Sequence, residues 1–130
     1  MKKKSVIIAI RDTDLRLSLD LMLRDEPYLH VLGTASTSES TCGLTRVEGP
    51  DLILLERALS DRPIEEMLKE IKGCSPNSKV ILFVNSTHQE PRLSQSESDA
   101  YLRIGGAPES IRSTIKNIIA KDSEFKQNKE

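Results

Sequence analysis

The stretch PDLILLERAL, residues 50–59, contains the feature that decides the fold. Its apolar run from Leu52 to Leu55 is too short for a core helix and too continuous for a strand with one face in water. Such a run is typical of a central strand in a parallel sheet, where both faces are covered. Open parallel sheets bind ligands just beyond the carboxyl ends of their strands. Glu56, which follows the run directly, is therefore the first candidate site residue.

Four further apolar runs accompany this one, at residues 6–10, 31–35, 80–84 and 100–104. The segments between them have helical periodicity, because apolar residues recur on one face of each. These faces contain Leu15, Leu19, Met22 and Leu23; then Ile64, Met67, Leu68 and Ile71; then Ile111, Ile115, Ile118 and Ile119. Alternating strands and helices with right-handed crossovers predict a three-layer, doubly wound α/β fold with a five-stranded parallel sheet and five flanking helices.

Several residues predict where helices begin. Ser36 and Glu39 have the spacing of a capping box, Pro63 suits a first helical position, and Pro108 with Glu109 opens the last helix. The fourth helix, within residues 86–98, should be short because it has only one large apolar side chain. We expect one domain over residues 1–120, followed by a polar tail or the start of a linker over residues 121–130.

Composition excludes some function classes. A chain of 130 residues with a net charge of -1 has no general attraction to nucleic acid or to anionic lipid. The apolar run near the amino terminus is too short to span a membrane, so we expect a cytoplasmic protein with no membrane partner. Cys42 and Cys74 lie far apart in the sequence and are predicted to be reduced thiols.

The residues at the strand ends do not favour a cofactor or a catalytic metal. The loop after the first strand lacks the glycines of a phosphate-binding loop, which argues against a flavin or nucleotide site. Asp12, Asp14 and Glu56 could supply carboxylates to magnesium. However, Arg11 and Arg57 flank them, and their permanent positive charge opposes a divalent cation. We therefore expect no cofactor and no metal.

Four stretches in order give the chain a resemblance to a known family: VIIAIRDTDLR, PDLILLE, SPNSKVILFV and DAYLRIGGAPESI. Over about residues 4 to 120 they resemble the receiver domains of bacterial two-component response regulators, in particular the NarL/LuxR-like branch. The resemblance implies the strand order 2-1-3-4-5. It also implies a signalling role in a phosphorelay rather than an enzymatic one.

The reactive positions of the family differ here. The resemblance implies two magnesium-binding aspartates after the first strand, but this sequence has Ile10 and Arg11 there, followed by Asp12. Glu56 occupies the position of the phosphoacceptor aspartate. Val84 replaces the threonine or serine after the fourth strand. Of the remaining switch positions, Tyr101 keeps an aromatic side chain, and Ile104 replaces a lysine. Because phosphoryl transfer depends on a metal and a cation, we expect a degenerate receiver without a phosphorylation cycle.

Arg11 and Glu56 suggest how the site is neutralised without a metal. A basic residue stands where the family has an acid, opposite the one acid that is retained. We hypothesise an ion pair between the two side chains; the alternative is that both point into solvent and contribute little to stability.

Three functions remain open. The first is a non-enzymatic module that docks to a protein partner or self-associates, for example as a dimer, through the fourth helix, fifth strand and fifth helix. It would control transcription only through an appended DNA-binding output domain. The second is a conventional phosphoacceptor that uses Glu56 or Asp61. The third is an anion or small-ligand sensor that uses Arg11 and Arg57.

Overall fold

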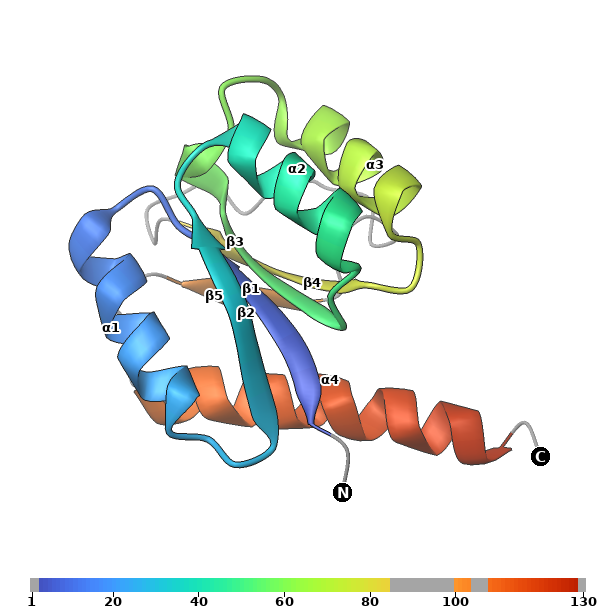
Figure 1. The fold of residues 1–130 in the computed structure, drawn as a ribbon. Helices are drawn as coiled ribbons and strands as arrows, with labels where there is room; N and C mark the ends of the chain where they lie inside the picture. Colours follow the sequence, from blue (N-terminus) through green and yellow to red (C-terminus); the bar gives the residue numbers. More distant parts are fainter. Residues whose placement is uncertain (1–2, 85–99, 104–107, 129–130) are drawn as a thin grey trace.

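A computed structural model describes residues 3–84, 100–103 and 108–128, and shows one sheet with helices on both faces (Figure 1). The strands are β1 (Lys4–Ala9), β2 (Leu29–Ala35), β3 (Leu52–Glu56), β4 (Lys79–Val84) and β5 (Ala100–Arg103). The helices are α1 (Thr13–Arg24), α2 (Ser38–Glu48), α3 (Ile64–Cys74) and α4 (Pro108–Asn128), with a short 3-10 helix, η1 (Arg57–Leu59), after β3.

All neighbouring strands pair in parallel, and their order is β2-β1-β3-β4-β5. This is the order that the resemblance implied. Within the described residues there are four α-helices rather than five. The fourth helix that we expected within residues 86–98 lies outside the described part of the chain.

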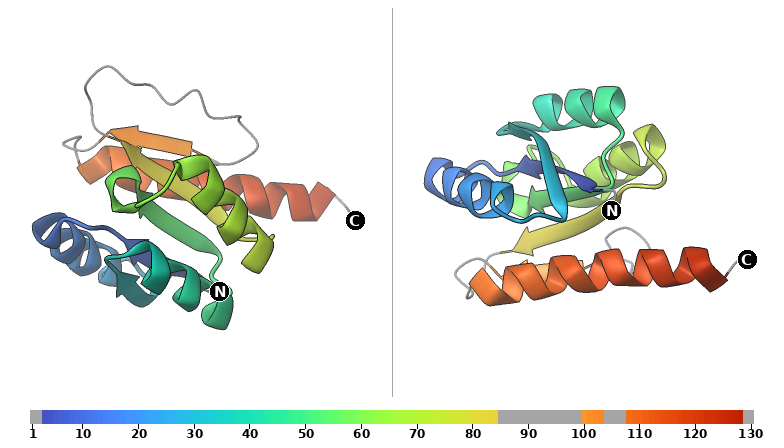
Figure 2. Two further views of the ribbon diagram at one scale, coloured as in Figure 1. Left: turned by 90° about the horizontal axis from the view of Figure 1, so that it is seen from above. Right: turned by 60° about the horizontal axis from the view of Figure 1, so that its bottom comes forward.

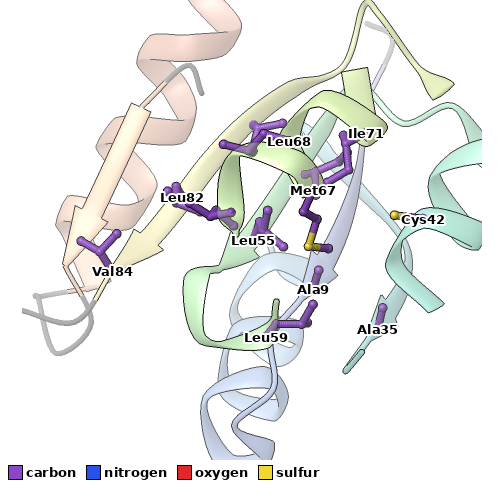
Figure 3. Close-up of a cluster of buried hydrophobic side chains, with 13 residues drawn as sticks. Ala9, Ala35, Cys42, Leu55, Leu59, Met67, Leu68, Ile71, Leu82 and Val84 are labelled. Carbon is purple, nitrogen blue, oxygen red and sulfur yellow. The ribbon is translucent and has the colours of Figure 1, made fainter. Parts of the chain in front are cut away.

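Side chains of β3 alternate between the two faces of the sheet, as they do in any strand. Ile53 and Leu55 belong to a buried cluster with residues of α2 and α3, which Figure 3 shows from Cys42 at one end to Val84 at the other. Leu52 and Leu54 belong to a second cluster with residues of α1 and α4. Figure 2 shows these helix pairs on opposite sides of the sheet. Both faces are thus covered, which explains the continuous apolar run of β3.

The starts of the helices agree with the sequence prediction in part. The capping box of α2 uses Thr37 and Ser40, so the predicted pair of Ser36 and Glu39 is wrong by one residue. This segment is rich in hydroxyl groups that can cap a helix, and the sequence does not distinguish between them. Pro63 lies one residue before α3, at its N-cap, whereas α4 begins at Pro108 as predicted.

The last helix is longer than the sequence suggested. α4 continues through Asn128, past residue 120, where we placed the end of the domain; that boundary stays a prediction. In Figure 1 its carboxyl-terminal part extends beyond the edge of the sheet. Within the described residues, no helix is long and apolar enough to cross a membrane.

Candidate functional site

The last residue of β3 places a carboxyl group under the first loop of the fold. Glu56 is 5% exposed, and in the sequence it follows the fully buried Leu54 and Leu55. β3 lies between β1 and β4, so its carboxyl end adjoins the turn from β1 to α1. The sequence thus correctly predicted that Glu56 stands at the carboxyl end of a central strand.

The Glu56 carboxylate binds the backbone of this turn. Its Oε1 atom accepts a hydrogen bond from the N–H of Arg11 at 2.7 Å and another from the N–H of Asp12 at 3.2 Å. Hydrogen bonds to an ionised acceptor are shorter and stronger than neutral ones. Glu56 therefore ties β3 to the β1–α1 turn.

The contact between Arg11 and Glu56 differs from the hypothesis drawn from the sequence. We expected the two side chains to pair, whereas the structure joins them through the backbone N–H of Arg11. Arg11 is an exposed residue, and the ion pairs of the described residues include none between its guanidinium and Glu56. The physical reason is proximity, since the backbone of the turn reaches the buried carboxylate before a side chain directed toward solvent does.

Asp12 has a structural task of its own. It is the N-cap of α1, and its Oδ1 atom accepts a hydrogen bond from the N–H of Leu15 at 2.9 Å. An aspartate in this position satisfies one of the free N–H groups of the first helical turn. The carboxylate of Asp12 is thus already engaged by its own helix.

Arg16 of α1 holds the same turn from the other side. Its Nη1 atom donates hydrogen bonds to the backbone oxygens of Ile10 at 2.9 Å and Arg11 at 3.2 Å. The sequence analysis missed this residue as part of the site. The available signal was its position in the stretch VIIAIRDTDLR, where it lies five residues after Arg11.

With these contacts, every backbone N–H and C=O group from Ile10 to Asp12 has a partner. The N–H of Ile10 donates to the carbonyl oxygen of Ala35 at 3.0 Å, and the carbonyl oxygen of Asp12 accepts from the N–H of Arg16 at 2.9 Å. Glu56 and the Arg16 guanidinium engage the other four groups. The turn is therefore fully satisfied within the protein.

As arranged here, these residues do not fit the magnesium ion that a receiver-type site implies. The Ile10 side chain is fully buried in the cluster below α1 and α4 and has no oxygen ligand to offer. Asp12 caps a helix, and the Glu56 atom Oε1 faces N–H groups. Among the described residues there is no group of three histidine, cysteine, aspartate or glutamate side chains that could hold a metal ion.

Of the three predicted switch positions, the structure describes the side chain of only one. Val84 is 6% exposed and belongs to the cluster that contains residues of β3, α2 and α3; Figure 3 shows it at the end of the cluster away from Cys42. Tyr101 lies on β5, where it pairs in register with Leu82 of β4. The Tyr101 side chain and Ile104 lie outside what the structure describes.

Asp61, the alternative phosphoacceptor, lines a hollow that does not include Glu56. It is exposed in the loop before α3, and its N–H donates to the hydroxyl of Ser38 at 3.3 Å. The hollow has a volume of about 300 Å³ and lies between α2 and α3. Its lining residues are Ser38, Glu39, Cys42, Gly43, Arg46, Asp61, Arg62 and Glu70.

The hollow contains an ion pair and a thiol that is difficult to ionise. The Arg62 guanidinium lies 2.5 Å from the Glu70 carboxylate and holds the pKa of Glu70 below its usual value. Burial, together with the nearby Glu70, raises the pKa of the Cys42 thiol to about 11. Arg62 and Glu70 are thus paired, and the Cys42 thiol stays protonated near neutral pH, so it is not an activated nucleophile.

The comparisons with known proteins were made on sequence and on structure. No protein-family model matches the chain. No curated protein sequence matches it either.

Solved structures do resemble it. A CheY-like response regulator receiver domain from Methanospirillum hungatei is similar with a TM-score of 0.81 at 21% identity, over 95% of this chain and 99% of that one. The signal receiver domain of the response regulator NarL from Mycobacterium tuberculosis has a TM-score of 0.78 at 16% identity, over 91% and 97% of the two chains.

A third similar structure is RcsB from Salmonella enterica serovar Typhimurium, determined bound to the promoter rprA. It has a TM-score of 0.80 at 14% identity, over 92% of this chain and 61% of RcsB. The strand order, the two helical layers and these similarities agree with one another. The chain therefore has the fold of response-regulator receiver domains.

Proposed function

We propose that this chain is a receiver-like signalling module that acts by contact with other proteins and does not run a phosphorylation cycle. The observation that carries the proposal is the state of Glu56 at the phosphoacceptor position. Its side chain is buried, and its Oε1 atom accepts the backbone hydrogen bonds of Arg11 and Asp12. An acid engaged in this way is a poor nucleophile for a phosphodonor in solvent.

The chemistry of phosphoryl transfer supports the same proposal. Transfer depends on a metal ion and a cation that neutralise the phosphoryl oxygens, together with in-line positioning. Here Ile10 and Arg11 replace the acids that the family resemblance assigns to the metal, and Ile104 replaces the lysine. Glutamate is also longer than aspartate, so its carboxylate reaches the backbone of the turn instead of ending at the strand.

The proposed interaction surface is the one that the family resemblance implies, formed by the fourth helix, fifth strand and fifth helix. The structure describes two parts of this surface, β5 and α4. The helix labelled α4 is the one that the sequence analysis counted as the fifth. Arg112 of α4 is already engaged within the chain, because its guanidinium pairs with Glu26 at 2.9 Å. RcsB, which is bound to a promoter in its structure, supports the further proposal that a module of this kind can regulate an appended DNA-binding domain.

Incubation with a small phosphodonor and magnesium, followed by intact mass measurement, tests the proposal. We expect no gain of a phosphate under conditions in which a phosphorylation-competent receiver domain, treated in parallel, is modified. A stable gain of one phosphate would contradict the proposal.

The variants Glu56→Gln and Asp61→Asn would then identify the acceptor. Loss of the modification in one of them would establish that residue as a conventional phosphoacceptor.

Thermal unfolding with and without phosphate, nucleotide or magnesium tests the third function, which is an anion or small-ligand sensor. A ligand that binds the folded state raises the melting temperature. A shift that is lost in Arg11→Met or Arg57→Met would support an anion sensor.

A further inference from the structure

Two consecutive peptide groups of the β1–α1 turn are held between opposite charges. The first joins Ile10 to Arg11, and the second joins Arg11 to Asp12. Glu56 accepts the N–H groups of both peptides, at 2.7 Å and 3.2 Å. The Arg16 guanidinium donates to the C=O groups of the same two peptides, at 2.9 Å and 3.2 Å.

The geometry of a trans peptide makes this arrangement favourable. The N–H and C=O groups point in opposite directions, and the structure has no cis peptide bonds among the residues it describes. A negative charge at the N–H end and a positive charge at the C=O end both align with the peptide dipole, and hydrogen bonds in a chain polarise one another. Each charge therefore strengthens the hydrogen bonds made by the other.

We propose that Arg16 is a positioning residue that supplies the counter-charge of Glu56, acting through these two peptide groups. The proposal deepens the proposed function, since it assigns to a residue of α1 the neutralising role that a metal has in a receiver with an intact acidic pocket. It also replaces the hypothesis that Arg11 is the counter-charge. Arg11 contributes its backbone, whereas Arg16 contributes its guanidinium.

The test is a double-mutant cycle on the full chain, measured by urea unfolding. The variants are Arg16→Met, Glu56→Gln and the double variant. A second cycle with Arg11→Met and Glu56→Gln is the matched control, because it removes the same charge from a neighbouring residue whose guanidinium contacts neither peptide group in the structure. We expect the first cycle to show a coupling of roughly threefold or more in the unfolding equilibrium constant, and the control cycle to show about twofold at most.

A spectroscopic readout separates this role from simple packing. In amide NMR spectra, Glu56→Gln should shift the amide protons of Arg11 and Asp12 upfield. Arg16→Met should shift the same two protons in the same direction, although Arg16 contacts the C=O groups of these peptides and not their N–H groups. Arg16→Lys, which keeps the charge, should restore part of both the shift and the coupling. Should Arg16→Met fail to fold, Arg16→Gln takes its place, because it keeps a donor but not the charge.

Absence of coupling between Arg16 and Glu56 would overturn the proposal, as would equal coupling in the control cycle. Either result leaves the proposed function standing, because that function is tested by the mass of the phosphodonor-treated protein. Conversely, a phosphorylated Glu56 would end the proposed function without bearing on the coupling measured in untreated protein.

Discussion

Glu56 of β3 and Arg16 of α1 share no direct hydrogen bond, yet both bind the two peptide groups that link Ile10, Arg11 and Asp12. This site at the carboxyl end of β3 is thus organised around backbone atoms. The contacts of this site and of the adjoining core support five predictions, each with its own measurement.

Glu56→Ala should lower the free energy of unfolding by about 2 to 3 kcal/mol, because two partly buried N–H groups lose their acceptor. Glu56→Gln keeps a neutral acceptor and should cost only about 1 kcal/mol. Urea unfolding measures both values. Glu48→Ala, which removes an exposed glutamate from α2, is the control and should change stability by less than about 0.5 kcal/mol. Equal effects at the two glutamates would show that the contacts of Glu56 contribute nothing.

Asp12→Ala should destabilise the protein by about 1 kcal/mol, since α1 loses its N-cap. Asp12→Asn should be close to neutral, because asparagine caps a helix as well as aspartate does. Thermal unfolding of both variants, with and without magnesium, checks this expectation. If Asp12→Asn removed a magnesium-dependent stabilisation of the parent protein, Asp12 would be a metal ligand rather than a cap alone.

Val84→Thr should cost about 1 to 2 kcal/mol, because it places a hydroxyl in the apolar cluster beneath α2 and α3. Val47→Thr is the matched control, since the same change is made at a valine that is 78% exposed, and it should stay within about 0.5 kcal/mol. Chemical denaturation compares the pair. A neutral Val84→Thr would mean that the hydroxyl finds a hydrogen-bond partner inside the cluster.

Cys42 should react with an alkylating reagent far more slowly than Cys74 at neutral pH, because its thiol is buried and its pKa is raised to about 11. Peptide mass analysis at successive times measures the two rates, and Cys74→Ser isolates Cys42. The raised pKa also makes stability depend on pH. Folding favours the protonated thiol, so this contribution is complete below the ordinary pKa of 9.0 and is lost as the pH rises toward 11.

Cys42→Ala should therefore flatten the fall in stability between pH 9 and pH 11. The experiment is urea unfolding at several alkaline pH values, with the parent protein beside it. An unchanged pH dependence in Cys42→Ala would show that another group titrates there.

The sequence was sufficient for the α/β class of the fold because the relevant signals are local and repeated. The run from Leu52 to Leu55 required a sheet covered on both faces, and the faces of the helices followed from their periodicity. The position of Glu56 at a strand end followed from the same apolar run, because Glu56 is the first charged residue after it. These features depend on pattern rather than on the conformation of any one side chain.

The contacts of the site could not be predicted in the same way. The sequence offers Arg11, Arg16 and Arg57 near one acid, and only the path of the backbone decides which group reaches it. The hypothesis chose Arg11 because of its place in the motif, whereas the turn directs its N–H to Glu56 and leaves the carbonyls to Arg16. The same limit explains the capping box at Thr37, since neighbouring hydroxyls compete for one helix end.

The complete pairing of the backbone from Ile10 to Asp12 has a consequence for substitutions in this turn. Shortening Glu56 to aspartate would strand two N–H donors, and an acid at position 11 would stand beside a carboxylate without an ion between them. Either substitution alone is thus expected to lower stability, because it removes a hydrogen-bond acceptor or adds a like charge. The turn would tolerate an acidic pocket only if several of its residues changed together.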